Sequence, residues 1–122
     1  DQIVNKYETF ELGYTGLGVF PNTRRPRVLW FGINKNDVLQ SLYKDINNQI
    51  DTLGFKQDNR GFKPHITIGR INFFRNTKLL HVKISQYKDF FFQNQLINEI
   101  MLYKSILKPT GAEYKIVQKH QF

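Results

Sequence analysis

A histidine and a threonine stand two residues apart in a segment that is otherwise typical of a β-strand. His65 and Thr67 lie within residues 64–70, whose sequence is PHITIGR. Because side chains alternate between the two faces of an extended chain, His65 and Thr67 point to the same face of a sheet. An imidazole takes or gives a proton near neutral pH, and a hydroxyl hydrogen-bonds a phosphoryl oxygen. The pair therefore suits a phosphate or phosphodiester.

Arg70 ends the same segment and has two open interpretations. Strict alternation puts Arg70 on the face opposite His65, so it reaches the same phosphate only if the strand bulges or twists. Gly69 is the residue that would allow such a bulge. Without a bulge, Arg70 is a surface or ion-pair residue.

An aromatic residue and a cluster of arginines lie near residue 20 and provide candidate contacts to nucleic acid. Phe20 follows a glycine-rich segment and is our candidate for stacking on a base, whereas Trp30, in an apolar run, is predicted to lie in the core. Arg24, Arg25 and Arg27 form a compact basic cluster, and we assign Arg25 to contacts with phosphate. More often, however, the charged side chains of such a cluster in a turn only face solvent.

The bulk composition limits the classes of function. The chain has 122 residues, with 18 Lys and Arg against 10 Asp and Glu, a net charge of +8. We expect a single domain over residues 1–122. The net charge alone fits an anionic partner and a merely basic, soluble surface equally well. The absence of cysteine excludes disulfides, thiolate metal sites and cysteine nucleophiles. No apolar stretch is long enough to span a bilayer and no signal peptide is visible, so we expect a cytoplasmic protein.

The apolar pattern predicts an α+β fold of antiparallel strands with covering helices. The residues at three- and four-residue steps after Asn36 predict an amphipathic helix that stops at Gly54, with Asn36 as its N-cap. Residues 79–84 fit both a strand and a helix, and we choose the helix. The predicted strands are the segment around His65 and residues 10–20, 28–33, 90–92, 100–103 and 114–119. We expect a kink or bulge in residues 10–20, and we expect residues 28–33 to be buried. We expect the eleven Phe and six Tyr to fill the core.

Four blocks of the sequence, in order, resemble the two-histidine (2H) phosphoesterase superfamily. They resemble in particular the RNA 2′,3′-cyclic phosphodiesterases, also called 2′-5′ RNA ligases or LigT-like proteins. Residues 17–22 and 25–32 resemble the family's glycine-phenylalanine-proline turn and the strand that follows it. Residues 64–70 resemble the second of its two HxTx motifs, and the blocks 102–107 and 111–114 resemble its C-terminal strand pair.

The resemblance implies a fold, a reaction and roles for individual residues. It implies two lobes, each with an antiparallel sheet, around a cleft in which two HxTx motifs face each other. His65 would be the general base that activates water, and the histidine of the first motif would protonate the leaving ribose oxygen. Thr67, and with it Arg70, would hold the phosphate. The implied activity is hydrolysis of the 2′,3′-cyclic phosphate ends of RNA or nucleotides to 2′-phosphates, with 2′-5′ ligation as a further activity and with no metal or cofactor.

The sequence departs from the family pattern because it holds a single HxTx motif. No histidine precedes His65, and neither His81 nor His120 is followed by Thr or Ser at the second position. The chain also begins with Asp rather than Met. We therefore expect an incomplete domain whose N-terminal part is missing, which is inactive alone and which exposes apolar sheet surface that favours a homodimer.

Two other interpretations stay open. In the first, the chain is a non-catalytic RNA-binding module derived from the 2H fold, with the basic surface kept and the chemistry lost. In the second, it is a basic α+β domain of unrelated function. A position of His65 and Thr67 under a helix, away from any cleft, would favour the second of these.

Overall fold

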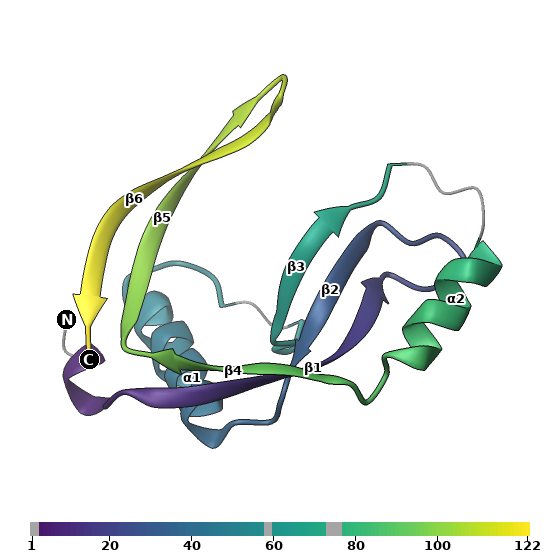
Figure 1. Ribbon diagram of the computed structural model, residues 1–122. Helices are drawn as coiled ribbons and strands as arrows, with labels where there is room; N and C mark the ends of the chain where they lie inside the picture. The colour runs from purple at the N-terminus through teal and green to yellow at the C-terminus, as the bar shows by residue number, and fades with distance from the viewer. Residues whose placement is uncertain (1–2, 58–59, 73–76) are drawn as a thin grey trace. The chain divides into compact units, whose positions relative to one another are not determined.

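The computed structural model of the chain describes residues 3–57, 60–72 and 77–122. It has the predicted mixed α+β fold with antiparallel sheets (Figure 1). The helical elements are η1 (Val4–Lys6, a 3-10 turn), α1 (Asp37–Thr52) and α2 (Thr77–Gln86). The strands are β1 (Phe10–Phe20), β2 (Val28–Ile33), β3 (His65–Arg70), β4 (Phe91–Ile97), β5 (Glu99–Lys108) and β6 (Gly111–Gln121).

These elements form two sheets and two compact units. One sheet has four strands in the order β3-β2-β1-β4, and the other is the antiparallel hairpin β5-β6. We call residues Glu11–Asp37 and Asp58–Gln95 the sheet unit. We call residues Asp1–Phe10, Val38–Gln57 and Leu96–Phe122 the hairpin unit.

Strand β1 contains the irregularity that its glycines predict. The register of β1 on β2 shifts between Tyr14 and Leu17, and Gly16 between them has a φ of 84°, which a side chain would strain. The Gly16 amide donates a hydrogen bond to the Phe90 carbonyl at 2.9 Å, and a Cβ at Gly16 would lie 2.6 Å from the Lys88 carbonyl oxygen. The bulge thus lets the segment before β4 approach β1 closely.

The two predicted helices are confirmed. Helix α1 covers the segment predicted from the three- and four-residue spacing, has Asp37 in its first turn and buries Leu42. Helix α2 forms where the sequence fitted both a helix and a strand. Residues 58 and 59, between this helix and β3, lie outside the described residues.

Of the phenylalanines and tyrosines expected to fill the core, only Tyr14 is buried among the described residues. The buried hydrophobic side chains are Val4 and Leu42 in the hairpin unit, and Leu12, Tyr14 and Val19 in the sheet unit. No phenylalanine among the described residues is buried, and β2, expected to be buried, is only half-buried along its length. Small units bury a small fraction of their surface, so rings here pack against each other while staying partly exposed.

Tyr14 is one of the few buried side chains of the sheet unit. Its hydroxyl donates a hydrogen bond to the Gln95 side-chain oxygen, and burial raises its pKa above the ordinary value of 10.0. The ring contacts between Phe31 and Phe92, with centroids 4.5 Å apart, and between Phe90 and Phe92, at 4.9 Å, lie in the same unit. These contacts stabilise the sheet unit without full burial.

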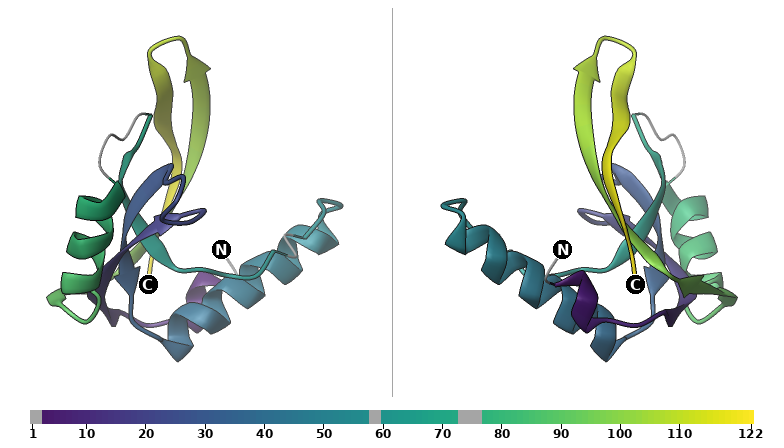
Figure 2. Two further views of the ribbon diagram at one scale, coloured as in Figure 1. Left: turned by 90° about the vertical axis from the view of Figure 1, so that its right-hand side faces the viewer. Right: turned by 90° about the vertical axis from the view of Figure 1, so that its left-hand side faces the viewer.

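The hairpin β5-β6 is longer than its sequence pattern predicted and exposes apolar side chains. Its register runs from Glu99 opposite Gln121 to Lys108 opposite Gly111, with an irregularity between Leu102 and Tyr103. Figure 2 shows the two strands side by side along their length. Neither strand has a buried residue, and Leu107 is 87% exposed.

Candidate functional site

Strand β3 lies at an edge of the four-stranded sheet and begins at His65. His65 is opposite Gly32, and Thr67 is opposite Trp30. Pro64 directly precedes the strand, as expected for a residue that has no amide hydrogen to donate to a neighbouring strand. His65 is thus the first residue of an edge strand.

A bulge interrupts β3 between its threonine and its arginine. Thr67 is opposite Trp30 and Gly69 is opposite Leu29, so Ile68 has no counterpart on β2. One extra residue on one strand of an antiparallel pair is the definition of a β-bulge, and it shifts the alternation of every residue that follows.

The bulge places Arg70 on the same face as His65. Residues directly opposite each other in an antiparallel pair share a face, and alternate residues on β2 do so too. Val28, Trp30 and Gly32 therefore share one face of β2. Their partners on β3 are Arg70, Thr67 and His65. The sequence left two interpretations open for Arg70, and the backbone has the bulge that the first of them requires.

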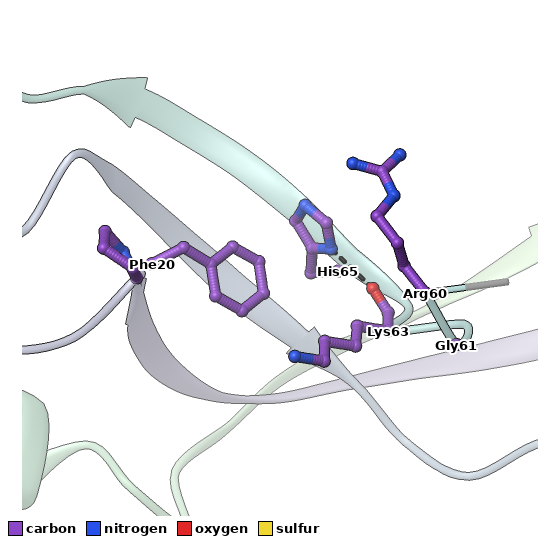
Figure 3. A pocket seen from close by; sticks show the side chains of 6 residues that line it. Phe20, Arg60, Gly61, Lys63 and His65 are labelled. Atoms are coloured by element: carbon purple, nitrogen blue, oxygen red, sulfur yellow. Dashed lines mark hydrogen bonds between the residues drawn. The ribbon is translucent and has the colours of Figure 1, made fainter. Parts of the chain in front are cut away.

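His65 has one ring nitrogen fixed and the other available. Its Nδ1 lies 2.6 Å from the Lys63 carbonyl oxygen, which only accepts, so Nδ1 carries the proton and donates it in this bond. In the neutral ring the lone pair is then on Nε2. The Phe20 ring meets the His65 ring edge-on, with centroids 4.9 Å apart at 88° (Figure 3). The imidazole is thus oriented by one hydrogen bond and one aromatic contact.

Trp30 and Gly18 support these two rings. The centroid of the Trp30 ring lies 5.1 Å from that of Phe20 and 6.3 Å from that of His65. Gly18 is opposite Trp30, and a Cβ at Gly18 would lie 2.1 Å from the indole, so only glycine leaves room for it. Trp30, predicted to lie in the core, is instead half-buried and packs behind the site.

A pocket opens beside these rings and contains two cations. Its cavity of about 440 Å³ is within the range of small-molecule sites, about 300–1,000 Å³. The lining residues are Phe20, Pro21, Arg60, Gly61, Lys63 and His65. Figure 3 shows Phe20 and Arg60 on opposite sides of His65. The Lys63 Nζ lies 6.0 Å from the centroid of the Phe20 ring, at the limit of a cation–π contact. The pocket suits an anion that carries an aromatic ring.

The structure gathers some of the predicted site residues and not others. Phe20 and His65 line the same pocket. Thr67 and Arg70 share the His65 face of β3 but are not among the described residues that line it. Arg25 is exposed on the β1–β2 turn, also outside this lining, and its amide donates to the Asn22 side-chain oxygen at 3.0 Å.

Sequence reasoning missed Arg60 and Lys63. Both are in the basic segment that leads into His65, and a count of charges beside the histidine could have singled them out. Among the described residues, no three His, Asp or Glu side chains are grouped closely enough to hold a metal ion. No helix in the described ranges is long and apolar enough to cross a membrane.

Comparison with known proteins gives the family. Residues 1–89 match the family model described as the 2′-5′ RNA ligase superfamily. The chain belongs to this superfamily, which confirms the resemblance drawn from its sequence at the level of the family.

Curated relatives and a solved structure agree with this assignment. A protein of Methanocaldococcus jannaschii named RNA 2′,3′-cyclic phosphodiesterase is 39% identical over 103 residues, which cover 84% of this chain and 58% of the relative. A protein of the same name from Thermotoga maritima is 32% identical over 119 residues, covering 98% of this chain and 62% of the relative. The chain thus spans less than two thirds of the length of either relative.

The fold itself is shared with a solved protein. The crystal structure of a protein from Thermus thermophilus superposes with a TM-score of 0.70 at 20% identity, over 98% of this chain and 66% of that one. At this identity the match shows a common fold.

Proposed function

We propose that the chain is the second-motif portion of an RNA 2′,3′-cyclic phosphodiesterase, with His65 as its general base. The observation that carries the proposal is the oriented imidazole of His65 in a pocket with Arg60 and Lys63. Two cations favour a phosphate, and the Phe20 ring offers a surface for a base. The name of the curated relatives supports the same reaction.

The orientation of His65 defines the proton transfer. Because Nδ1 is engaged with the Lys63 carbonyl, Nε2 takes the proton from the attacking water. The water oxygen bonds to phosphorus, the bond from phosphorus to the 3′ oxygen breaks, and a second group must protonate that oxygen. The product is a 2′-phosphate with a free 3′-hydroxyl. A 5′-hydroxyl of RNA in place of water would give 2′-5′ ligation.

The remaining predicted residues have supporting roles in this proposal. Thr67 and Arg70, on the His65 face of β3, hold phosphoryl oxygens of the cyclic phosphate. Arg25, on the β1–β2 turn, contacts a phosphate of the RNA strand. The scheme uses proton transfer and hydrogen bonding alone, and therefore involves no metal or cofactor. We also propose that the protein acts in the cytoplasm, since a chain without cysteine fits a reducing compartment.

Alone, the chain is expected to hydrolyse little or no cyclic phosphate. Its single HxTx motif supplies one of the two proton-transferring groups that the reaction needs. The assay is hydrolysis of 2′,3′-cyclic AMP by the 122-residue chain. Robust turnover that disappears in His65→Ala would contradict the expected inactivity and would show that the base works without a second motif.

Binding tests the site independently of turnover. In a calorimetric titration with 2′,3′-cyclic AMP, His65→Ala should weaken binding about two- to tenfold, because it removes a ring that lines the pocket and packs against Phe20. His120→Gln, in the hairpin unit, is the matched control and should bind as wild type does. Equal affinity of wild type and His65→Ala would contradict the assignment.

The alternative is a non-catalytic RNA-binding module, which the basic pocket and the single motif also favour. It predicts salt-dependent binding of RNA that ends in a cyclic phosphate, with an affinity that His65→Ala leaves unchanged. The phosphodiesterase proposal predicts instead that His65→Ala removes the preference for a cyclic phosphate end over a 3′-hydroxyl end.

We further propose that the apolar hairpin promotes a homodimer. Leu102, Leu107, Tyr114, Ile116 and Val117 are exposed on β5 and β6. An exposed apolar surface next to unpaired strand edges favours pairing with a second copy. Size-exclusion chromatography that gives a clean monomer at high concentration would contradict the dimer.

A further inference from the structure

A second pocket lies in the sheet unit, at the start of α2. Its cavity of about 400 Å³ is lined by Thr23, Arg24, Thr77, Lys78, His81 and Val82. Two of these residues come from the β1–β2 turn and four from the first part of α2. Nothing in the reaction outlined above uses this pocket.

The polar groups of this pocket are those that bind phosphate. Arg24 and Lys78 are cations, and His81 adds a ring nitrogen; all three side chains are exposed and accessible to a ligand. The hydroxyls of Thr23 and Thr77 add donors. Most of the accessible lining is apolar, but no carboxylate is among the lining residues that the structure describes, so the polar groups of the pocket are cations and hydrogen-bonding groups.

The β1–β2 turn connects this pocket to the first one. Pro21 lines the pocket of His65, and Thr23 lines the second pocket. Two residues of extended chain span at most about 7 Å, so their Cα atoms are no farther apart than that. The turn is also fixed: the Asn22 side-chain oxygen accepts hydrogen bonds at 3.0 Å from the amides of Arg24 and Arg25.

We infer that the second pocket binds a backbone phosphate of the RNA strand whose cyclic end lies against His65. The inference rests on the proposed function, because it takes the first pocket as the place of the strand's end. A strand that leaves the first pocket across the turn brings its next phosphates to Arg24 and Lys78. Cationic grooves that follow the backbone, beside aromatic stacking surfaces, are the usual way in which proteins bind single strands. The ligand of the second pocket is thus an internal phosphodiester, which a mononucleotide lacks.

The test compares a strand with a mononucleotide. The probes are 2′,3′-cyclic AMP and a labelled hexaadenylate that ends in a 2′,3′-cyclic phosphate. The double variant Arg24→Ala with Lys78→Ala should weaken hexaadenylate binding about tenfold, as expected for loss of a charge-assisted contact. It should also reduce the slope of log affinity against log salt by about 0.7, the value for one phosphate of a single strand.

A matched control separates the effect of the pocket on binding from the effect of total charge. The double variant Lys83→Ala with Lys88→Ala removes the same charge from exposed positions in and just after α2 that do not line the pocket. This variant should change hexaadenylate affinity by less than about twofold, because exposed charges outside contact range are screened by salt. An equal loss in both double variants would overturn the inference.

Imidazole signals locate the contact directly. In the NMR spectrum of the wild-type chain, the His81 signals should shift with hexaadenylate and stay unchanged with 2′,3′-cyclic AMP. Absence of a His81 shift with hexaadenylate, or wild-type hexaadenylate binding too weak to detect, would overturn the inference. A different result would contradict the proposed function alone. In that result, His65→Ala leaves the affinity for 2′,3′-cyclic AMP unchanged, while the double variant of Arg24 and Lys78 still weakens hexaadenylate binding.

Discussion

The sheet unit and the hairpin unit use their surfaces differently. The sheet unit gathers the imidazole, the aromatic rings and the cations of both pockets around the β1–β2 turn, β3 and α2. The hairpin unit has an apolar cavity of about 270 Å³ next to Leu42, and strands whose apolar side chains face solvent. The candidate chemistry is therefore confined to one unit.

The site is supported by residues of the sheet unit itself. The site strand β3 has no buried residue, and the Trp30 indole, for which Gly18 leaves room, packs against the rings of His65 and Phe20. Changes in the buried residues of the hairpin unit should thus alter stability and leave the site's ligand contacts intact. Changes behind His65 should alter both.

The largest expected effect is on stability, from the hairpin unit. Leu42 is the most buried of the core side chains, and Leu42→Ala should lower the free energy of unfolding by about 2–5 kcal/mol in urea titrations. At low temperature, the fraction that remains folded should still show the His65 response to 2′,3′-cyclic AMP. Loss of that response in folded protein would show that the site depends on the core of the hairpin unit.

A smaller loss of stability, with loss of binding, is expected from the sheet unit. Gly18→Ala puts a Cβ where the Trp30 indole lies and should cost about 1–3 kcal/mol, the usual cost of overpacking. Because the indole supports Phe20 and His65, affinity for 2′,3′-cyclic AMP should fall too. Gly69→Ala is the control, since no described atom lies within 4 Å of an added Cβ. If Gly18→Ala binds as tightly as Gly69→Ala, the indole does not support the site.

A pH-dependent effect is expected in the hairpin unit. The Tyr7 hydroxyl donates a hydrogen bond to Asp45 at 2.6 Å, and desolvation together with this carboxylate raises the pKa of Tyr7 to about 12. The folded state therefore holds the phenolic proton more tightly than the unfolded state, whose pKa is near 10.0. The resulting stability is complete below pH 10 and is lost as the pH rises towards about 12.

Tyr7→Phe measures this effect. At neutral pH the variant should be less stable than wild type by about 1 kcal/mol, the usual net value of a hydrogen bond. The difference in unfolding free energy between the two should shrink as the pH rises from 10 towards about 12. Parallel pH curves for wild type and Tyr7→Phe would rule out a linked proton.

The smallest stability effect is expected at the exposed end of the hairpin. Leu107→Ser should change the free energy of unfolding by less than about 0.5 kcal/mol, because Leu107 packs against little. It should nevertheless shift size-exclusion elution towards the monomer if the hairpin associates with a second copy. Unchanged elution of an existing dimer would place the interface elsewhere.

Local sequence patterns predicted the elements and the position of His65. The spacing after Asn36, the glycines of β1 and the alternation around His65 each act within a few residues, so α1, the β1 bulge and the strand β3 could be predicted. The face of the sheet on which Arg70 lies could not be predicted, because it depends on the register of β3 against Leu29 and Trp30. A one-residue offset between two strands is a tertiary property.

The environment of the site was harder to predict than its strand. Trp30 lies in an apolar run, and apolar runs usually indicate a core, whereas here the indole packs beneath Phe20 and His65 on a half-buried sheet. Arg60 and Lys63 line the pocket because the loop before β3 folds towards Phe20, which no local pattern encodes. Their positive charge was visible in the sequence, but their place beside the ring was not.

The most direct test of the account is the imidazole NMR spectrum of the 122-residue chain during titration with 2′,3′-cyclic AMP. The chain has three histidines, which the single variants His65→Ala, His81→Ala and His120→Gln assign. On saturation, the His65 signals should shift while the His81 and His120 signals stay in place. A spectrum in which the His65 signals do not move, or in which all three histidines shift alike, would contradict a cyclic-phosphate site at His65.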